Sequence, residues 1–325
     1  MAAQALARDL ISNQPDAVLG TIVSLLPTKD GCRTQGLSRR WRHIWRSAPL
    51  NLAAGRRDRR GQLPAYDFSK VLSSHLGPVR RIHIIGIGPL WYRTRHEVIG
   101  EAGGDARIDG WVGSPRVLAG LEVLDIAYSY YGEVLPPSVF RLAPVLRVAS
   151  FSRCRLPANL AVDLPSLEKL GLYNIFLTEE ALCALLSGCP ALRSLRTNLD
   201  TWGYRSRLSN HLPKYMENVR KYALPDDPVE CLEFHLKKVA IKVYCGMGME
   251  VEFARFFVLN GKVIEKMEFG LVDDPKDDLR VTQNTLLQLE DRASRDARFE
   301  FKSSIISSIL DVDRDDPCAS LPNTD

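Results

Sequence analysis

The feature that most constrains the fold is a set of short β-like segments in the middle of the chain, each of which begins at a leucine. They read LEVLDIAY, LRVASFSRCRLP, LEKLGLYNIFLT and LRSLRTNL and start at Leu121, Leu146, Leu167 and Leu192, which are 25, 21 and 25 residues apart. Repeated units of this length cannot bury their apolar side chains alone, so they must stack on one another. A regular array of strands is therefore predicted.

Two of these segments match the template of leucine-rich repeats, L-x-x-L-x-L-x-x-[NC]-x-L. Between the last two copies, TEEALCALLSGCPAL predicts a helix that begins at a Thr178 cap. Together with an earlier strand-like segment, RRIHIIGI, these patterns predict leucine-rich repeats over residues 80–200. The template positions are filled by Leu146, Ala149, Phe151, Cys154 and Leu156 in one copy and by Leu167, Leu170, Leu172, Ile175 and Leu177 in another.

A different pattern, with three short helices, occupies residues 9–52. In the first helix, apolar residues recur at helical spacing from Val18 to Leu26, and Pro27 ends it. Thr28 is expected to cap the second helix and Ser38 the third. In the third, Trp41, Ile44 and Trp45 share one stripe, and the opposite side carries Arg39, Arg42, His43 and Arg46. The tryptophans are thus predicted to form a core and the arginines to face solvent.

An alternative interpretation of the same arginine-rich stretch, LSRRWRHIWR, is a nucleic-acid site. Stacking on bases requires tryptophans that are exposed beside the arginines, and the helical spacing separates the two. The chain has 43 basic and 39 acidic residues, which gives no strong overall positive charge. We therefore expect no nucleic-acid partner.

After a polar connection at 201–227, residues 228–272 form a third unit. HLKKVAIKVY alternates as a strand, EVEFARFFVLNGKV reads as an apolar helix, and VIEKMEFGLV returns as a strand beside the first. This βαβ-like unit is predicted to close the solenoid, since terminal repeats need a cover. TLLQLEDRASRDARFEF predicts one more amphipathic helix within 273–310. Residues 53–79 are expected to be a linker, and residues 1–8 and 311–325 to be disordered.

The sequence contains no motif for catalysis, a cofactor or a metal. Nucleotide-binding, hydrolase and zinc-protease signatures are missing, the six histidines are far apart, and the seven cysteines include no Cys-x-x-Cys pair. We expect no enzyme activity and no cofactor. Without a signal peptide or a membrane-spanning stretch, the chain is expected in the nucleus or cytoplasm and not at a membrane.

The N-terminal block resembles the F-box of plant F-box/leucine-rich-repeat proteins. The signatures that carry the resemblance are PD-x-V-L, LPTKD, RT and LSRRWRHIW. The third unit resembles the FBD domain of the same family, and LEDRASRDARFEF resembles a C-terminal helix common in its grass members. The predicted fold class is α/β: a small three-helix F-box, then a short leucine-rich-repeat solenoid that a βαβ-like FBD unit closes.

The resemblance implies a substrate receptor of an SCF-type ubiquitin ligase, in which the F-box binds a SKP-type adaptor, and through it a cullin, while the repeats bind an unknown protein target. It places the adaptor contact on Pro15, Val18, Leu19, Ile22, Leu25, Leu26, Pro27, Cys32, Arg33 and Leu37. The target is expected on the concave face of the repeats, at Asp125, Tyr128, Ser150, Ser152, Gly171 and Tyr173.

A second hypothesis keeps the interaction surface and removes the ligase. The family usually has leucine where this chain has Gln14, and larger residues at the positions of Gly31 and Gly36. A divergent leucine-rich-repeat protein that no longer engages the adaptor would also fit these residues.

Overall fold

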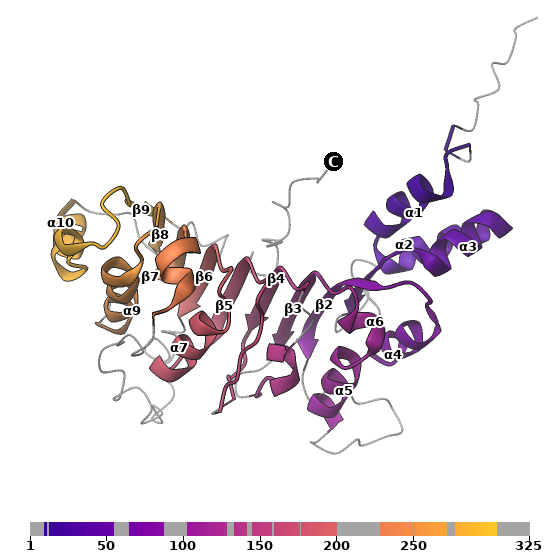
Figure 1. Cartoon of the computed structure of the whole chain (residues 1–325), viewed down its shortest axis with the longest axis horizontal. Helices are drawn as coiled ribbons and strands as arrows, with labels where there is room; N and C mark the ends of the chain where they lie inside the picture. The colour runs from indigo at the N-terminus through magenta and orange to yellow at the C-terminus, as the bar shows by residue number, and fades with distance from the viewer. Residues whose placement is uncertain are drawn as a thin grey trace, which may run out of the picture.

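The structure is a computed structural model of the whole chain, shown in Figure 1. It describes residues 10–11, 13–54, 65–87, 103–128, 133–141, 145–157, 159–175, 177–199, 228–246, 248–271 and 277–303. The predicted connection at 201–227 and the predicted disordered ends at 1–8 and 311–325 lie outside these residues.

Three helices form an N-terminal helical unit: α1 (Asp16–Leu25), α2 (Thr28–Arg33) with a short 3-10 turn η1 (Thr34–Gly36), and α3 (Arg39–Ser47). The Ser38 hydroxyl accepts a hydrogen bond from the backbone N–H of Trp41, which confirms the predicted cap of α3. The prediction that Thr28 caps α2 is wrong. Thr28 is buried and its hydroxyl donates to the carbonyl of Asn51, because the first strand runs beside this helix.

All nine strands of the described residues join one parallel sheet in which the strands follow sequence order (Figure 1). This arrangement confirms the stacked repeats and extends them in both directions. The strands are β1 (Leu50–Ala54), β2 (Val79–Ile87), β3 (Val123–Tyr128), β4 (Val148–Ser152), β5 (Lys169–Ile175), β6 (Ser194–Leu199), β7 (Lys238–Tyr244), β8 (Lys266–Leu271) and β9 (Arg298–Ser303).

Helices α5, α7 and α9 lie along one side of the sheet (Figure 1). We call the other side, which carries the alternate residues of each strand, the open face. The Thr178 hydroxyl accepts a hydrogen bond from the N–H of Ala181, so the predicted cap of α7 is confirmed. The connecting elements are α4 (Ala65–Ser74), α5 (Gly103–Val112), α6 (Pro115–Leu118), η3 (Pro137–Arg141), α7 (Glu179–Ser187), η5 (Cys231–His235), α9 (Gly248–Asn260), α10 (Asp277–Leu286) and η6 (Leu289–Asp291).

One level of the sheet runs through all nine strands as an apolar ladder. Its members face the helices and, except for the half-buried last one, are fully buried. Because each strand offers its apolar residue at the same level, the core is continuous from the first strand to the last. In order of strands, the apolar ladder is Leu52, Ile82, Leu124, Ala149, Leu170, Leu195, Val239, Met267 and Phe299.

The predicted βαβ arrangement of the third unit is confirmed, since β7 pairs with β8 in parallel and α9 connects them. The prediction that this unit closes the sheet is wrong, because β9 pairs with β8 and takes the edge position. The helix predicted across residues 285–301 is wrong for most of its length, because α10 ends at Leu286 and only the short turn η6 lies between it and β9. Residues 298–303, RFEFKS, alternate at the period of a strand, and Phe301 stacks on Phe269 with ring centroids 4.7 Å apart.

Residues 53–54 and 65–79 are the described part of the stretch predicted as a linker. It includes the end of β1, helix α4 and the start of β2. Its last residues fasten the N-terminal helical unit to the sheet, because the backbone N–H groups of Leu76 and Gly77 both donate to the carbonyl of Arg46. No apolar period in these residues is strong enough to predict this junction.

His75 lies buried at the same junction. Its Nε2 is 2.8 Å from the Ala48 carbonyl oxygen, and the Trp45 ring meets it edge-on at a centroid distance of 5.3 Å. Burial lowers the pKa of His75 below its ordinary value; the bond to Ala48 opposes this shift, and Arg116 adds to it. The folded protein therefore favours the neutral imidazole.

We predict that part of the stability of this junction is lost on acidification. The pKa of His75 is lower in the folded state than in the unfolded state. The contribution of the neutral His75 to the free energy of unfolding is therefore fully present above the unfolded pKa of about 6.5, and it falls as the pH decreases toward the folded pKa. Urea unfolding at pH 7.5 and pH 5 should show a smaller pH-dependent loss for His75→Gln than for the natural chain. His43→Gln, which alters an exposed histidine, is the control; an equal loss in all three proteins would contradict the prediction.

Candidate protein-interaction surfaces

Helix α1 has apolar residues on two sides. Leu19 and Val23 point inward and are buried, whereas Val18, Ile22 and Leu25 are 42%, 39% and 70% exposed. Leu37, after η1, is 67% exposed. We call Val18, Ile22, Leu25 and Leu37 the outer apolar face. Large apolar side chains exposed together on so small a unit are typical of a protein-binding site.

The ten residues predicted to bind an adaptor differ in how far they are buried. Leu19 is fully buried against the core of the helical unit, so its assignment to a contact surface is wrong. Sequence spacing alone could not decide this, because both sides of α1 are apolar. Leu26 is half-buried, and the other eight are exposed: Pro15, Val18, Ile22, Leu25, Pro27, Cys32, Arg33 and Leu37.

The predicted inner core of the helical unit is confirmed, since Trp41, Ile44 and Trp45 are all buried. The ring of Trp45 lies directly against Gly31, where an added Cβ atom would approach a ring carbon to 2.3 Å. Gly36 differs, because an added Cβ there would meet nothing within 4 Å. Of the two glycines, only Gly31 is therefore required by packing.

The arginines of α3 face outward as the sequence predicted. Arg39, Arg42 and Arg46 are exposed, on the side away from the tryptophans. Arg40 pairs with Asp16 at 2.7 Å and so ties α3 to the start of α1. This separation of rings from cations is the opposite of what base stacking needs.

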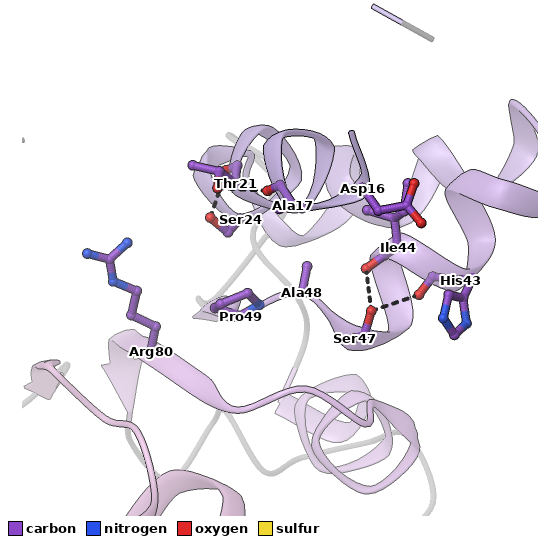
Figure 2. A pocket seen from close by; sticks show the side chains of 11 residues that line it. Asp16, Ala17, Thr21, Ser24, His43, Ile44, Ser47, Ala48, Pro49 and Arg80 are labelled. Atoms are coloured by element: carbon purple, nitrogen blue, oxygen red, sulfur yellow. Dashed lines mark hydrogen bonds between the residues drawn. The ribbon is translucent and has the colours of Figure 1, made fainter. Parts of the chain in front are cut away.

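A pocket of about 450 Å³ lies between α1, α3 and the start of β2 (Figure 2). Its hydroxyl groups are occupied by their own helices: Thr21 donates to Ala17, Ser24 to Thr21, and Ser47 to His43 and Ile44. Of its charged residues, Asp16 holds Arg40, and Arg80 holds Glu122 at 2.9 Å. No nucleophile is paired with a base among the residues that line this pocket.

The residues predicted to bind a target lie mostly on the open face. Asp125, Ser150 and Gly171 follow one another at one level of β3, β4 and β5, and Ser152 and Tyr173 pair at another. Oδ2 of Asp125 is 2.7 Å from Nδ1 of His83, on the next strand. Tyr128 is a wrong assignment, because it lies on the core side with Leu124 and Ile126 and is only 1% exposed.

This part of the open face offers little side-chain surface. Ser150, Ser152 and Tyr173 are 3%, 7% and 5% exposed. The Tyr173 ring leans over Gly171, where a Cβ atom would lie 2.8 Å from it. The predicted target surface is therefore largely covered.

The open face changes character from β5 onward, where basic residues accumulate. Lys169, Arg196, Lys238 and Lys242 occupy open-face positions of β5, β6 and β7, and no carboxylate stands at the open-face positions of these three strands. Sequence reasoning missed them, although strand alternation around the buried Leu170, Leu195 and Val239 would have found them.

Among the described cysteines, Cys154, Cys189 and Cys231 are buried, and burial raises the pKa of each thiol to about 12. They are packing residues. The described parts of the chain contain no group of three histidine, cysteine or carboxylate side chains that could hold a metal ion. None of their helices combines the length and hydrophobicity of a membrane span.

Comparison with known families identifies two parts of the chain. Residues 108–229 match the family described as FBD-associated F-box protein At5g56370, LRR repeats, and residues 224–269 match the FBD family. The second range corresponds to the unit predicted at 228–272. No solved structure matches the chain.

Several curated proteins of Arabidopsis thaliana are similar in sequence. FBD-associated F-box protein At4g13985 is 30% identical over 58% of this chain and 42% of its own length. Putative F-box/FBD/LRR-repeat protein At3g49480 is 29% identical over 58% and 43%, and FBD-associated F-box protein At5g56370 is 32% identical over 57% and 42%. The matches thus span about two fifths of these relatives.

The two glycines of the helical unit should respond oppositely to substitution. Gly31→Val forces a side chain into the Trp45 ring and should destabilise the fold by about 1–3 kcal/mol. Gly36→Ala is the matched control, and thermal unfolding should show little change or a gain of up to about 1 kcal/mol. Equal unfolding temperatures for both variants would contradict this packing.

Proposed function

We propose that the chain, which matches the repeats and the FBD unit of plant F-box/FBD/leucine-rich-repeat proteins, is the substrate-recognition subunit of an SCF-type, cullin-RING ubiquitin ligase. In this proposal the N-terminal helical unit is the F-box and binds a SKP-type adaptor, which connects it to a cullin. The parallel sheet and its helices hold a protein target. The ligase would work in the nucleus or cytoplasm.

The outer apolar face is the observation that carries this proposal. The helical unit already has a complete core of tryptophans and leucines, yet Ile22, Leu25 and Leu37 remain exposed to solvent. Burial of large apolar residues in a partner's groove gives helix recognition much of its binding free energy. An apolar groove in a SKP-type adaptor is the partner that this face fits.

The receptor needs no active site of its own in this mechanism. It holds the target close to a conjugating enzyme carried elsewhere in the assembly, which raises the effective concentration of the target's lysine. In the pocket between α1, α3 and β2, the hydroxyl groups of Thr21, Ser24 and Ser47 already donate to backbone carbonyls, which agrees with a binding role.

Substitution of the outer apolar face should abolish adaptor binding. Ile22→Glu together with Leu25→Glu places two charges in the predicted contact, and we expect the amount of co-purified SKP-type adaptor and cullin to fall at least about tenfold. The unfolding temperature should change little, since both side chains are exposed.

The matched control is Arg39→Gln with Arg42→Gln, which changes the net charge equally on the other side of the unit. This variant should co-purify normally. If the intact chain retains no adaptor at all, the ligase role is wrong, and the protein is a divergent leucine-rich-repeat binding protein outside the ligase.

A further inference from the structure

We propose that the open face of β5 to β9 binds an extended acidic segment of a partner protein. The contact is made by a basic row, which we define as Lys169, Arg196, Lys238, Lys266 and Arg298. This inference rests on the proposed function only in naming the partner as the ligase target. The binding itself requires neither adaptor nor cullin.

The basic row follows from the register of the sheet. At one level the residues on β5 to β9 are Lys169, Ser194, Lys238, Lys266 and Arg298. Arg196 fills the gap above the serine, two residues further along β6. Neighbouring strands are about 4.8 Å apart, so the row crosses roughly 19 Å of the surface.

Most of this charge is not neutralised by the protein itself. Arg196, Lys238 and Arg298 make no ion pair within the described ranges, and the last two are exposed. Lys266 is bound by Glu268 at 2.5 Å and Glu300 at 3.1 Å. These two carboxylates also bind Lys302, so they are shared between two lysines, and the remaining positive charge of the row rests on Arg196, Lys238 and Arg298.

An extended peptide matches the spacing of this row. On β6 and β7 the long basic side chains alternate with the small residues Ser194 and Ala240, since Ser194 pairs with Lys238 and Arg196 with Ala240. An extended chain advances about 3.3 Å per residue, so roughly six residues cross the row. Alternate side chains of such a chain point the same way, which favours acidic residues at every second position.

Two features favour a protein over a nucleic acid. Glu268 and Glu300 pair with Lys266 and Lys302 and interrupt the positive charge on β8 and β9, so the row offers no continuous cationic track for a phosphate backbone. The aromatic residue at the open-face positions of β5 to β9, Tyr173, is only 5% exposed and cannot stack on bases.

The test uses the purified full chain and a fluorescein-labelled peptide of ten residues in which glutamate and serine alternate. Fluorescence anisotropy should show at least about tenfold tighter binding than for the same peptide with glutamine in place of glutamate, and weaker binding at higher salt. Equal binding of the two peptides overturns the inference. So does tighter binding of an oligothymidylate of equal charge.

Variants locate the contact. Arg196→Ala with Lys238→Ala should weaken peptide binding about tenfold, whereas Arg39→Ala with Arg42→Ala, which removes the same charge from α3, should leave it unchanged. Lys238→Glu should lose the glutamate peptide and gain affinity for a lysine–serine peptide, which a misfolded variant would not do. Equal effects of the two double variants overturn the inference.

The outcome is independent of the adaptor experiment. Adaptor co-purification without peptide binding overturns this inference and leaves the ligase role intact. Peptide binding without adaptor co-purification overturns the ligase role and leaves the basic row as the binding surface of a free interaction protein.

Discussion

The apolar ladder is the constraint on which the rest of this molecule depends. From Leu52 on β1 to Phe299 on β9, each strand places an apolar residue against the helices at a single level. Full burial of such a side chain contributes roughly 1.5–3 kcal/mol, and each layer covers the next, so no strand is stable without its neighbours.

The same register determines which residues lie side by side on the opposite side of the sheet. Once Leu170, Leu195 and Val239 are aligned in the core, the basic residues one position before or after them must form rows as well.

The ladder also joins the N-terminal helical unit to the sheet as one body. Only Ala48 and Pro49 separate α3 from β1, and Asn51 of β1 both donates to Ser24 and accepts from Thr28. The buried Thr28 and His75 would lose their partners if the two parts moved apart. In the proposed ligase receptor this junction would hold the adaptor and the target in a fixed direction, on which catalysis by proximity depends.

The sequence predicted most of this fold because its periods are strong. The leucine spacing gave β3 to β6, and the stripe of Trp41, Ile44 and Trp45 gave the core of α3. The sequence was less informative where one pattern of apolar residues is compatible with two different structures. Leu19 lies on a helix that is apolar on both sides, and only the position of α3 decides which side is buried. The apolar pattern of RFEF, residues 298–301, is compatible with both a helix and a strand. Pairing with the edge of β8 makes it a strand. The basic row could not be predicted from sequence spacing, because its members come from strands up to 129 residues apart in the chain and only the register brings them to one level.

The two proposed surfaces lie toward opposite ends of the sheet, and this separation has a consequence for function. The outer apolar face belongs to the unit beside β1, whereas the basic row begins at β5, four strand spacings or roughly 19 Å further along, and ends at β9. On β4, between the two surfaces, the open-face residues Ser150 and Ser152 are buried, and the His83–Asp125 pair lies on β2 and β3. A target held by a short acidic segment on the basic row would therefore extend its folded part away from the adaptor or back across β2 to β4. If the proposed ligase role holds, only the second orientation would bring the target's lysines toward the ligase, and the direction in which the segment crosses β5 to β9 would decide which targets are modified.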